Sequence, residues 1–224
     1  MKRVALIVAG GSGTRMGTVL PKQFLLLNGK AILLHSVEAF KSAFPDIKFV
    51  VVLPEAYLDY ARELIAEQHY PFEIDLACGG ETRFDSVKNG LFLVADADLI
   101  FVHDAVRCLV SQKLIQACSE MASIKGSAIP VVPVRDSMRR VSKNGKESSV
   151  VDRENLYVVQ TPQTFTSKLL LAAFQAPYSP LFTDEASVVE AGGHTVGLIA
   201  GEESNIKITY SEDLDFAAWK INRK

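Results

Sequence analysis

Short apolar runs recur along the chain. They occupy residues 4–9, 49–53, 74–77, 99–103, 128–132 and 195–199. Strands that are buried on both faces of a parallel sheet are near-continuous apolar runs of about this length. The runs therefore predict the strands of one buried sheet.

The segments between the runs have the period of a helix. Apolar residues three or four positions apart form two stripes, one of Phe84, Val87, Leu91 and Val94 and the other of Leu114, Ile115, Cys118 and Met121. Strands that alternate with helices predict an α/β fold with a Rossmann-like, doubly wound, mostly parallel sheet. Such a sheet binds ligands at the carboxyl ends of its strands, where Gly10, Gly80 and Asp104 follow predicted strands.

One segment departs from this alternation. Residues 135–152 are polar and lack a helical stripe, and Asn144-Gly145 within them is a hairpin signal. An isolated two-stranded hairpin is marginal in water, so we expect this arm to protrude and to pack on something outside its own sheet. A solvated loop is the alternative. The chain is expected to be one domain, residues 1–224, with a β-arm insertion at about 135–154.

The composition suits a folded protein that handles small anions. With 224 residues, of which 48% are hydrophobic, the chain can bury a sizeable core. Its formal net charge of −2 argues against a surface for nucleic acid or for an anionic membrane, so neither is expected as a partner. Any positive cluster must be local.

The sequence does not indicate a targeting segment, a disulfide framework or a zinc site. The apolar stretch after Lys2 and Arg3 ends at residue 9, which is too short for a signal peptide or a membrane span, so a cytoplasmic location is expected. The three cysteines are odd in number and include no C-x-x-C pair, which predicts reduced thiols. The four histidines lack the spacing of metal ligands.

A glycine-rich turn follows the first predicted strand. Its sequence is Gly10-Gly11-Ser12-Gly13-Thr14-Arg15-Met16-Gly17, and Pro21-Lys22-Gln23 comes shortly afterwards. Glycines let backbone N–H groups approach a ligand without Cβ interference, and such a nest binds anions. Arg15 and Lys22 add fixed positive charge on either side of the turn, so the segment predicts a triphosphate site.

Two better-known glycine loops do not fit this turn. A Walker A loop has lysine directly after its last glycine, but Gly17 is followed by Thr18. The dinucleotide fingerprint needs glycine where Met16 stands, and an acidic residue at a strand end about 20 positions further on. Glu38 falls inside a predicted helix instead, which disfavours a dinucleotide oxidoreductase.

The turn resembles the signature loop of the sugar-phosphate nucleotidyltransferases, and later segments narrow the resemblance to the 2-C-methyl-D-erythritol 4-phosphate cytidylyltransferase family. These segments are Gly79-Gly80-Glu81-Thr82-Arg83-Phe84-Asp85-Ser86-Val87, His103-Asp104-Ala105-Val106-Arg107, Pro133-Val134-Arg135-Asp136, Val151-Asp152-Arg153, Gln160-Thr161-Pro162-Gln163, Thr183-Asp184-Glu185-Ala186-Ser187 and Asn205-Ile206-Lys207. Seven ordered matches over nearly the whole chain are hard to obtain by chance.

The resemblance implies that a phosphate oxygen of a sugar-alcohol phosphate displaces pyrophosphate from the α-phosphorus of CTP. A phosphate monoester is mostly dianionic at neutral pH, with a second pKa of about 6, so no protein base is needed. Catalysis then consists of positioning two anions and stabilising their charge. The matching positions imply that Arg15 and Lys22 stabilise the α-phosphate, while Arg153 and Lys207 hold the acceptor's phosphate and direct its attack.

Mg²⁺ is the expected cofactor, and Asp104 is its candidate ligand. Asp104 follows the apolar run 99–103, where this fold offers a carboxylate to a metal ion that bridges phosphate oxygens. A capping or turn aspartate is the alternative. Arg107 could hold the acceptor or pair with Asp104, and Cys108 stands where the family usually has proline, which makes the turn less rigid.

The other site residues also come from the family match. The residues implied to bind CTP are Ala9, Gly10, Gly11, Gly13, Gly80, Asp85, Ser86 and Asp104, of which Gly80, Asp85 and Ser86 would read the cytosine edge. Those implied to bind the acceptor are Arg107, Ser137, Arg153, Thr161, Thr183 and Asp184. A base reader can reject uracil because an unpaired buried polar group costs roughly 1–3 kcal/mol. Ser86 could instead cap a helix.

The resemblance further implies a homodimer in which the β-arm interlocks with the arm of a second subunit. Arg153 lies beyond the hairpin, so each active site would borrow this arginine from its neighbour. Two rival functions stay open. A ribitol 5-phosphate cytidylyltransferase shares the first loop and residues 103–107, and a catalytically dead nucleotide-binding module would be expected to have lost Arg15, Lys22 or Lys207.

Overall fold

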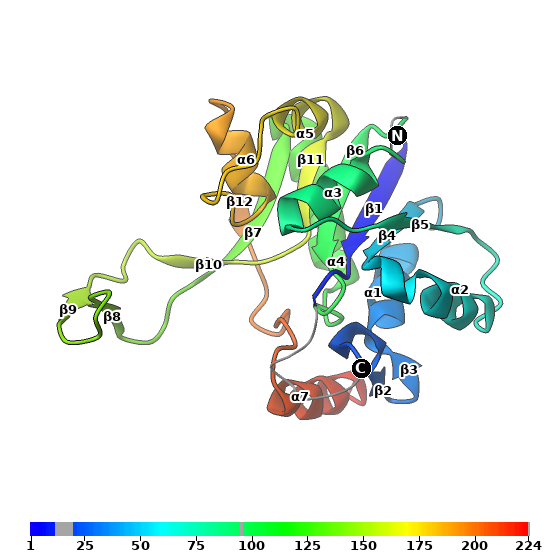
Figure 1. Cartoon of the computed structure of the whole chain (residues 1–224), viewed down its shortest axis with the longest axis horizontal. Helices are drawn as coiled ribbons and strands as arrows, with labels where there is room; N and C mark the ends of the chain where they lie inside the picture. The colour runs from blue at the N-terminus through cyan, green and yellow to red at the C-terminus, as the bar shows by residue number, and fades with distance from the viewer. Residues whose placement is uncertain (12–19, 95, 224) are drawn as a thin grey trace.

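The central sheet is built in two halves. The computed structural model describes residues 1–11, 20–94 and 96–223. Within them, eight strands form one sheet in the order β10-β7-β11-β6-β1-β4-β5, with β12 paired to β7 (Figure 1). The parallel half comprises β1 (Arg3–Val8), β4 (Lys48–Leu53), β5 (Ile74–Cys78) and β6 (Leu99–Asp104). The predicted doubly wound, mostly parallel α/β sheet is confirmed.

The other half of the sheet mixes strand directions. It comprises β7 (Ser127–Pro133), β10 (Tyr157–Val159), β11 (Gln163–Thr166) and β12 (Leu198–Ala200). The strand β11 runs antiparallel to β6 and β7, β10 runs antiparallel to β7, and β12 runs parallel to β7. The apolar pattern did not predict β10, which is short, or β11, which is mostly polar.

The strand predicted at residues 195–199 is shifted in the structure, because regular pairing begins only at Leu198. The residue before it, Gly197, lies close to β7 and donates its N–H to the hydroxyl of Ser127 at 3.0 Å. A Cβ at Gly197 would stand 2.9 Å from the carbonyl oxygen of Ser127. The carbonyl of Gly197 also accepts from the N–H of Ile129 at 2.8 Å, so the chain already contacts β7 one residue before β12 begins.

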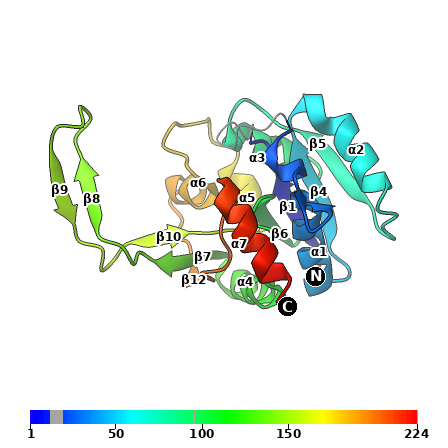
Figure 2. The ribbon, with the colours of Figure 1, turned by 90° about the horizontal axis from the view of Figure 1, so that it is seen from below.

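Helices cover both faces of the sheet (Figure 2). On one face lie α1 (Ile32–Ala43) and α4 (Gln112–Lys125), and α2 (Leu58–Ala66), beside β5, adds Ala61 to the same apolar cluster. On the other face lie α3 (Arg83–Leu91), α5 (Ser167–Ala173) and α6 (Glu185–Ala191). The predicted stripe that begins at Leu114 lies on α4, and the one that begins at Phe84 lies on α3 except for Val94, which follows the end of that helix.

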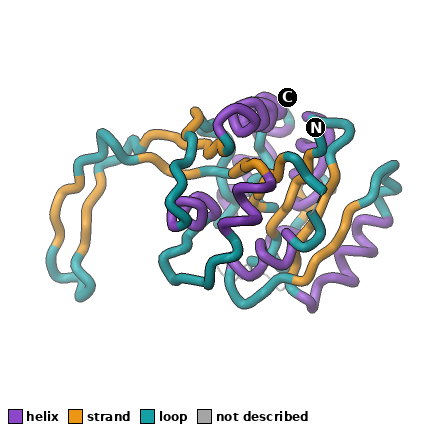
Figure 3. Tube along the Cα trace, turned by 90° about the horizontal axis from the view of Figure 1, so that it is seen from above, coloured by secondary structure: helices purple, strands orange, loops and turns teal. Residues whose placement is uncertain are grey.

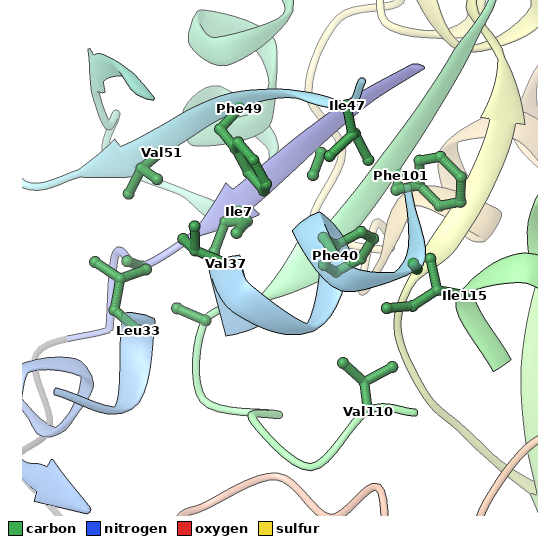
Figure 4. Packing of buried hydrophobic residues seen from close by; sticks show 14 of the residues in the cluster. Ile7, Leu33, Val37, Phe40, Ile47, Phe49, Val51, Phe101, Val110 and Ile115 are labelled. Carbon is green, nitrogen blue, oxygen red and sulfur yellow. The ribbon is translucent and has the colours of Figure 1, made fainter. Parts of the chain in front are cut away.

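The largest apolar cluster lies between the sheet and α1 (Figure 4). Successive strand residues point to opposite faces, so Ile7 of β1 enters this cluster while Leu6 enters the one beneath α3. Phe40 of α1 packs edge-on against Phe101 of β6, with ring centroids 5.6 Å apart. Truncation of such a fully buried ring to alanine typically costs about 3–5 kcal/mol, so these contacts fix α1 on the sheet.

A smaller apolar cluster closes the carboxyl end of the sheet beneath α7 (Ser211–Ile221). It includes Leu27, Cys108, Ile208 and Ala217. The short elements of this end are the single turns η2 (Lys22–Phe24) and η3 (Glu55–Tyr57) and the strands β2 (Leu26–Leu27) and β3 (Lys30–Ala31). Cys108 is buried in this cluster, and the Arg107 N–H still closes a turn onto the Asp104 carbonyl at 3.0 Å.

The predicted hairpin is present and lies apart from the body of the molecule (Figure 3). It pairs β8 (Met138–Val141) with β9 (Ser148–Val151) in antiparallel register. Gly145 in its turn has φ 71°, a left-handed conformation that glycine adopts readily. Every residue of β8 is exposed, so the arm has little packing within its own chain.

Among the described residues, no helix is both long and apolar enough to cross a bilayer.

Candidate active site

A pocket of about 290 Å³ opens at the carboxyl ends of β1 and β6. The order of the parallel strands reverses between these two strands, and open α/β sheets bind ligands at such a point. Its lining residues are Val8, Ala9, Gly10, Gly11, Lys22, Gln23, Gly80, Glu81, Thr82, Arg83, Ser86, Asp104, Val106 and Lys207. The structure thus brings together many of the residues implied to bind CTP and two of the predicted catalytic cations.

Asp104 lies on the floor of the pocket and is paired with three cationic side chains. Its Oδ1 is 2.7 Å from Nη1 of Arg83, and its Oδ2 is 2.9 Å from Nζ of Lys207. A longer ion pair of 3.6 Å joins Oδ2 to Nε of Arg107. Burial alone would raise the pKa of Asp104, but these cations outweigh it and hold the pKa well below its usual range. Asp104 is therefore a carboxylate at any physiological pH.

Asp104 is fixed by its neighbours at the end of β6. Its N–H donates to Oγ1 of Thr161 at 3.0 Å, and the Thr161 hydroxyl lies 3.1 Å from Nδ1 of His103. The other ring nitrogen of His103 is 3.3 Å from the carbonyl of Arg107. A neutral imidazole that donates from Nε2 and accepts at Nδ1 satisfies this arrangement. Full burial lowers the pKa of His103 to about 3, in agreement with that neutral form.

Arg83 was not among the predicted site residues, yet it is central to the pocket. It begins α3, and its Nη2 lies 3.0 Å from Oε2 of Glu185, the first residue of α6. The side chain of Glu185 is only 2% exposed. Burial raises the pKa of Glu185, whereas the two carboxylates together raise the pKa of Arg83. The only signal in the sequence was the presence of both residues in family-like segments.

Lys22 and Lys207 reach the pocket from different elements. Lys22 is the first residue of η2, which begins after Pro21, and its Nζ donates to the carbonyl of Ile208 at 2.8 Å. Gln23 is buried and donates to the carbonyl of Ala9 at 2.7 Å, which holds η2 against the end of β1. These contacts hold the segment that follows the glycine turn at the pocket.

The glycine turn is described only in part. Gly10 and Gly11 are exposed at the pocket. Among the residues that the structure describes, no atom lies within 4 Å of a Cβ built at Gly11. Gly13 and Arg15 lie outside the described residues, and their roles stay predictions.

The segment after β5 forms the opposite wall of the pocket. The N–H of Gly80 donates to Oγ of Ser86 at 3.1 Å, and a Cβ on Gly80 would stand 2.3 Å from Cβ of Asp85. Asp85 does not line the pocket, because its carboxylate forms a capping box with Thr82 at the start of α3. Thr82 is the N-cap of α3, so Ser86 does not cap this helix. Asp85 shapes the wall rather than facing the pocket.

Three of the residues implied to bind the acceptor are engaged within the chain. Arg107 is buried and donates to the carbonyls of Asn205 at 2.8 Å and Val159 at 3.3 Å. Thr161 supports Asp104 through the hydrogen bond to its N–H. Asp184 caps α6, accepts from the Gln163 side chain at 2.8 Å, and is not a lining residue of the described pocket.

Thr183, Ser137 and Arg153 are all exposed, and none of them lines the pocket as described. Arg153 lies between β9 and β10 and donates to the carbonyl of Arg135 across the base of the arm. Ser137 immediately precedes β8. One copy of the chain therefore does not bring the arm residues to its own pocket.

The described residues do not form a resident metal site. They contain no group of three His, Cys, Asp or Glu side chains that could hold an ion. Asp104 is a single carboxylate, and three cations already contact its oxygens. Mg²⁺ is usually bound by one or two carboxylates together with substrate phosphates. Ligation of Mg²⁺ by Asp104 thus stays a prediction.

Comparisons with known proteins agree with this geometry. The sequence model of the 2-C-methyl-D-erythritol 4-phosphate cytidylyltransferase family matches residues 3–223. Proteins of that name from Bacteroides fragilis and Bacteroides thetaiotaomicron are 45% and 46% identical, over 97% and 96% of this chain and 99% and 97% of their own lengths. The crystal structure of the Francisella tularensis protein of that name superimposes with a TM-score of 0.80 at 30% identity, covering 98% of this chain and 100% of that one.

Proposed function

This chain belongs to the 2-C-methyl-D-erythritol 4-phosphate cytidylyltransferase family, and we propose that it transfers the cytidylyl group of CTP to 2-C-methyl-D-erythritol 4-phosphate. The products are 4-diphosphocytidyl-2-C-methyl-D-erythritol and pyrophosphate, as part of non-mevalonate isoprenoid synthesis. The observation that carries this proposal is the pocket at the switch point, where Lys22 and Lys207 lie beside Gly10 and Gly11. Cations next to a glycine turn match the chemistry of a triphosphate.

The cluster around Asp104 has an excess of positive charge. The cations Arg83, Arg107 and Lys207 face the carboxylates of Asp104 and Glu185, so one positive charge is left over before Lys22 is counted. Asp104 keeps the cations in fixed positions while they are desolvated. Preorganised charge of this kind stabilises the charge that develops in a transition state without reorganisation.

The reaction needs no general base from the protein. A dianionic phosphate acceptor is already the nucleophile, so its oxygen can attack the α-phosphorus of CTP in line with the departing pyrophosphate. Lys22 and Lys207 would offset the charge of the two anions, and Gly80 and Ser86, which line the pocket, would contact the base. The neutral His103 is buried behind Asp104 and serves as support, not as a general base.

We also propose a homodimer that completes each site with residues from the arm of the other subunit. Arg153 is exposed and does not line the pocket of its own chain, while the arm projects away from the body (Figures 1 and 3). The exposed apolar residues Met138, Val141 and Val150 on the hairpin suit burial against a second copy.

A release assay tests the proposed reaction. The protein is incubated with Mg²⁺ and CTP or UTP, together with methylerythritol phosphate or ribitol 5-phosphate, and pyrophosphate is followed. We expect rapid release only with CTP and methylerythritol phosphate. Faster turnover of ribitol 5-phosphate would support the ribitol 5-phosphate cytidylyltransferase, and no release with any pair would favour a non-catalytic nucleotide-binding module.

A mixing experiment tests the composite site. An Arg153→Ala chain and a Lys22→Ala chain, each nearly inactive alone, are allowed to exchange subunits. Each heterodimer would carry one site with both defects and one site with neither. Activity should therefore rise on mixing, and each heterodimer should have about half of the activity of a parent dimer. Verified exchange with no gain in activity would place Arg153 in its own subunit's site and contradict the crossing arm.

Two expectations from the sequence stay predictions. Mg²⁺ would accompany the triphosphate, which supplies most of the oxygen ligands that such an ion takes. A cytoplasmic location is the second of these predictions.

A further inference from the structure

Two cations of the pocket depend on neighbouring residues of one loop. This loop, residues 201–210, connects β12 to α7 and contains neither helix nor strand (Figure 1). We call it the lysine strap. Lys207 belongs to the strap and places its Nζ 2.9 Å from Oδ2 of Asp104. The next residue, Ile208, accepts a hydrogen bond from Nζ of Lys22 at 2.8 Å. A shift of the strap would displace both ammonium groups.

The strap begins in a two-point contact with Gln160. The side-chain amide of Gln160 accepts from the N–H of Glu202 at 3.1 Å and donates to the carbonyl of the same residue at 2.8 Å. Gly201 lets this amide approach, because a Cβ there would stand 2.5 Å from its oxygen. Gln160 is 4% exposed, so water does not compete for these bonds.

Asn205 fixes the strap two residues before Lys207. It is fully buried, and its Nδ2 donates to the carbonyl of Thr161 at 2.9 Å and to Oε1 of Gln160 at 3.4 Å. Both partners are acceptors, which sets the orientation of the amide. The main-chain carbonyl of Asn205 in turn accepts from Arg107 at 2.8 Å. Asn205 of the strap and Gln160 outside it thus form one buried network that anchors the strap.

We propose that Gln160 and Asn205 are positioning residues, which set Lys22 and Lys207 together by holding the strap. This inference rests on the proposed function, in which both lysines stabilise phosphate charge. Lysine side chains are long and flexible, and a displacement of about 1 Å at a reacting centre can cost 10²-fold in rate. The strap has no continuous ladder of backbone hydrogen bonds, but the N–H of Ile208 donates to the carbonyl of Val106 at 3.0 Å. Ile208 thus fixes the strap on one side of Lys207, and the two amides fix it on the other side.

Double-mutant cycles test this proposal. Asn205→Ala should lower kcat/KM about tenfold in the parent protein, but only about threefold or less in the Lys22→Ala or the Lys207→Ala background, because the lysine that it positions is already absent. Gln160→Ala should behave in the same way. Activities are measured well below the unfolding transition, which circular dichroism locates for each variant.

Ser127→Ala serves as the matched control. Its buried hydroxyl accepts from the N–H of Gly197 at 3.0 Å, ahead of the strap, so it tests the loss of a buried hydrogen bond that has no link to the lysines. Its effect should be the same factor in all three backgrounds. Two results would contradict the shared positioning. One is that Asn205→Ala lowers kcat/KM by the same factor in the parent, Lys22→Ala and Lys207→Ala backgrounds. The other is that its effect is reduced only in the Lys207→Ala background. Lysine variants with parent activity would instead contradict the proposed function.

Discussion

Arg83 and Glu185 are 102 residues apart in the sequence, yet an ion pair of 3.0 Å joins the start of α3 to the start of α6. The same guanidinium contacts Asp104 through its other nitrogen at 2.7 Å. One cation is therefore shared by two buried carboxylates, that of Asp104 at the end of β6 and that of Glu185 at the start of α6. This sharing ties the floor of the pocket to the outer helix layer.

Removal of that cation should strongly destabilise the fold. Arg83→Met leaves Asp104 and Glu185 buried without their common partner, and breaking a buried pair in this way typically costs about 3–5 kcal/mol of unfolding free energy. Urea unfolding at pH 7.5 measures the loss. The loss should shrink at lower pH, since protonation of the carboxylates removes their uncompensated charge.

Arg62→Met is the control for Arg83→Met. Arg62 pairs with Asp59 on the surface of α2, where both side chains are mainly exposed. Such a pair typically contributes at most about 1 kcal/mol. Equal losses for the two variants would show that the buried position of Arg83 has no special effect on stability.

His103 should make the protein less stable as the pH falls below neutrality. Its pKa is about 3 in the folded chain and about 6.5 when unfolded. The unfolded state therefore binds the proton first, and this contribution to stability is present above pH 6.5 and is lost as the pH falls towards 3. Between pH 6.5 and pH 5 the loss from this group amounts to about 2 kcal/mol.

A glutamine at this position can isolate that effect. In His103→Gln the amide can accept from Thr161 and donate to the carbonyl of Arg107, but it does not titrate. Urea unfolding of this variant between pH 6.5 and pH 5 should lack the loss attributed to the imidazole. A pH dependence equal to that of the parent would mean that His103 is not held neutral in the fold.

The parallel half of the fold could be predicted from the sequence because its strands are buried on both faces. Strands such as β1 and β6 therefore consist almost entirely of apolar residues. The strand β11 escaped the same reasoning, since its Gln163 and Thr164 are polar and nonetheless buried. The burial of Gln163 depends on tertiary partners, the Asp184 carboxylate and the Ala186 N–H, which local periodicity does not reveal.

The site was predictable where a motif carried its own chemistry. Lys22 follows a glycine turn and Asp104 ends an apolar run, and both lie at the pocket. The function of Asp85 and Thr161 was harder to assign, because each forms hydrogen bonds within the chain and not toward the cavity. Arg83 was not predicted as a site residue, since its buried partner Glu185 is distant in the sequence.

Asp104→Asn should impair turnover, because the amide keeps the shape of the carboxylate but no longer attracts Lys207. We expect kcat to fall about tenfold or more. A Mg²⁺ titration tests the predicted ligation of the ion by Asp104, which requires partial rescue of the variant by higher Mg²⁺. A half-saturating Mg²⁺ concentration equal to that of the parent would contradict ligation and leave Asp104 the role of holding the cations.

Loss of either cation that we propose to stabilise the α-phosphate should be severe for catalysis and mild for folding. Lys22→Ala and Arg15→Ala should each lower kcat at least about 10²-fold, because one preorganised charge at the reacting phosphorus typically contributes roughly 3 kcal/mol. Steady-state assays and thermal unfolding measure the two effects. Lys113→Ala, an exposed lysine on α4, is the control and should retain parent turnover. If either variant kept the kcat of the parent, the role assigned to that residue would be wrong.

The most direct test of the account follows the oxygen atoms of the acceptor. Methylerythritol phosphate labelled with ¹⁸O in its phosphate is converted with CTP, and the products are read by ³¹P NMR isotope shifts. Attack by the acceptor's phosphate on the α-phosphorus predicts one ¹⁸O in the bridge of the new diphosphate, bonded to the phosphorus from CTP, and unlabelled pyrophosphate. Label in the pyrophosphate, or a bridge without ¹⁸O, would contradict the proposed reaction.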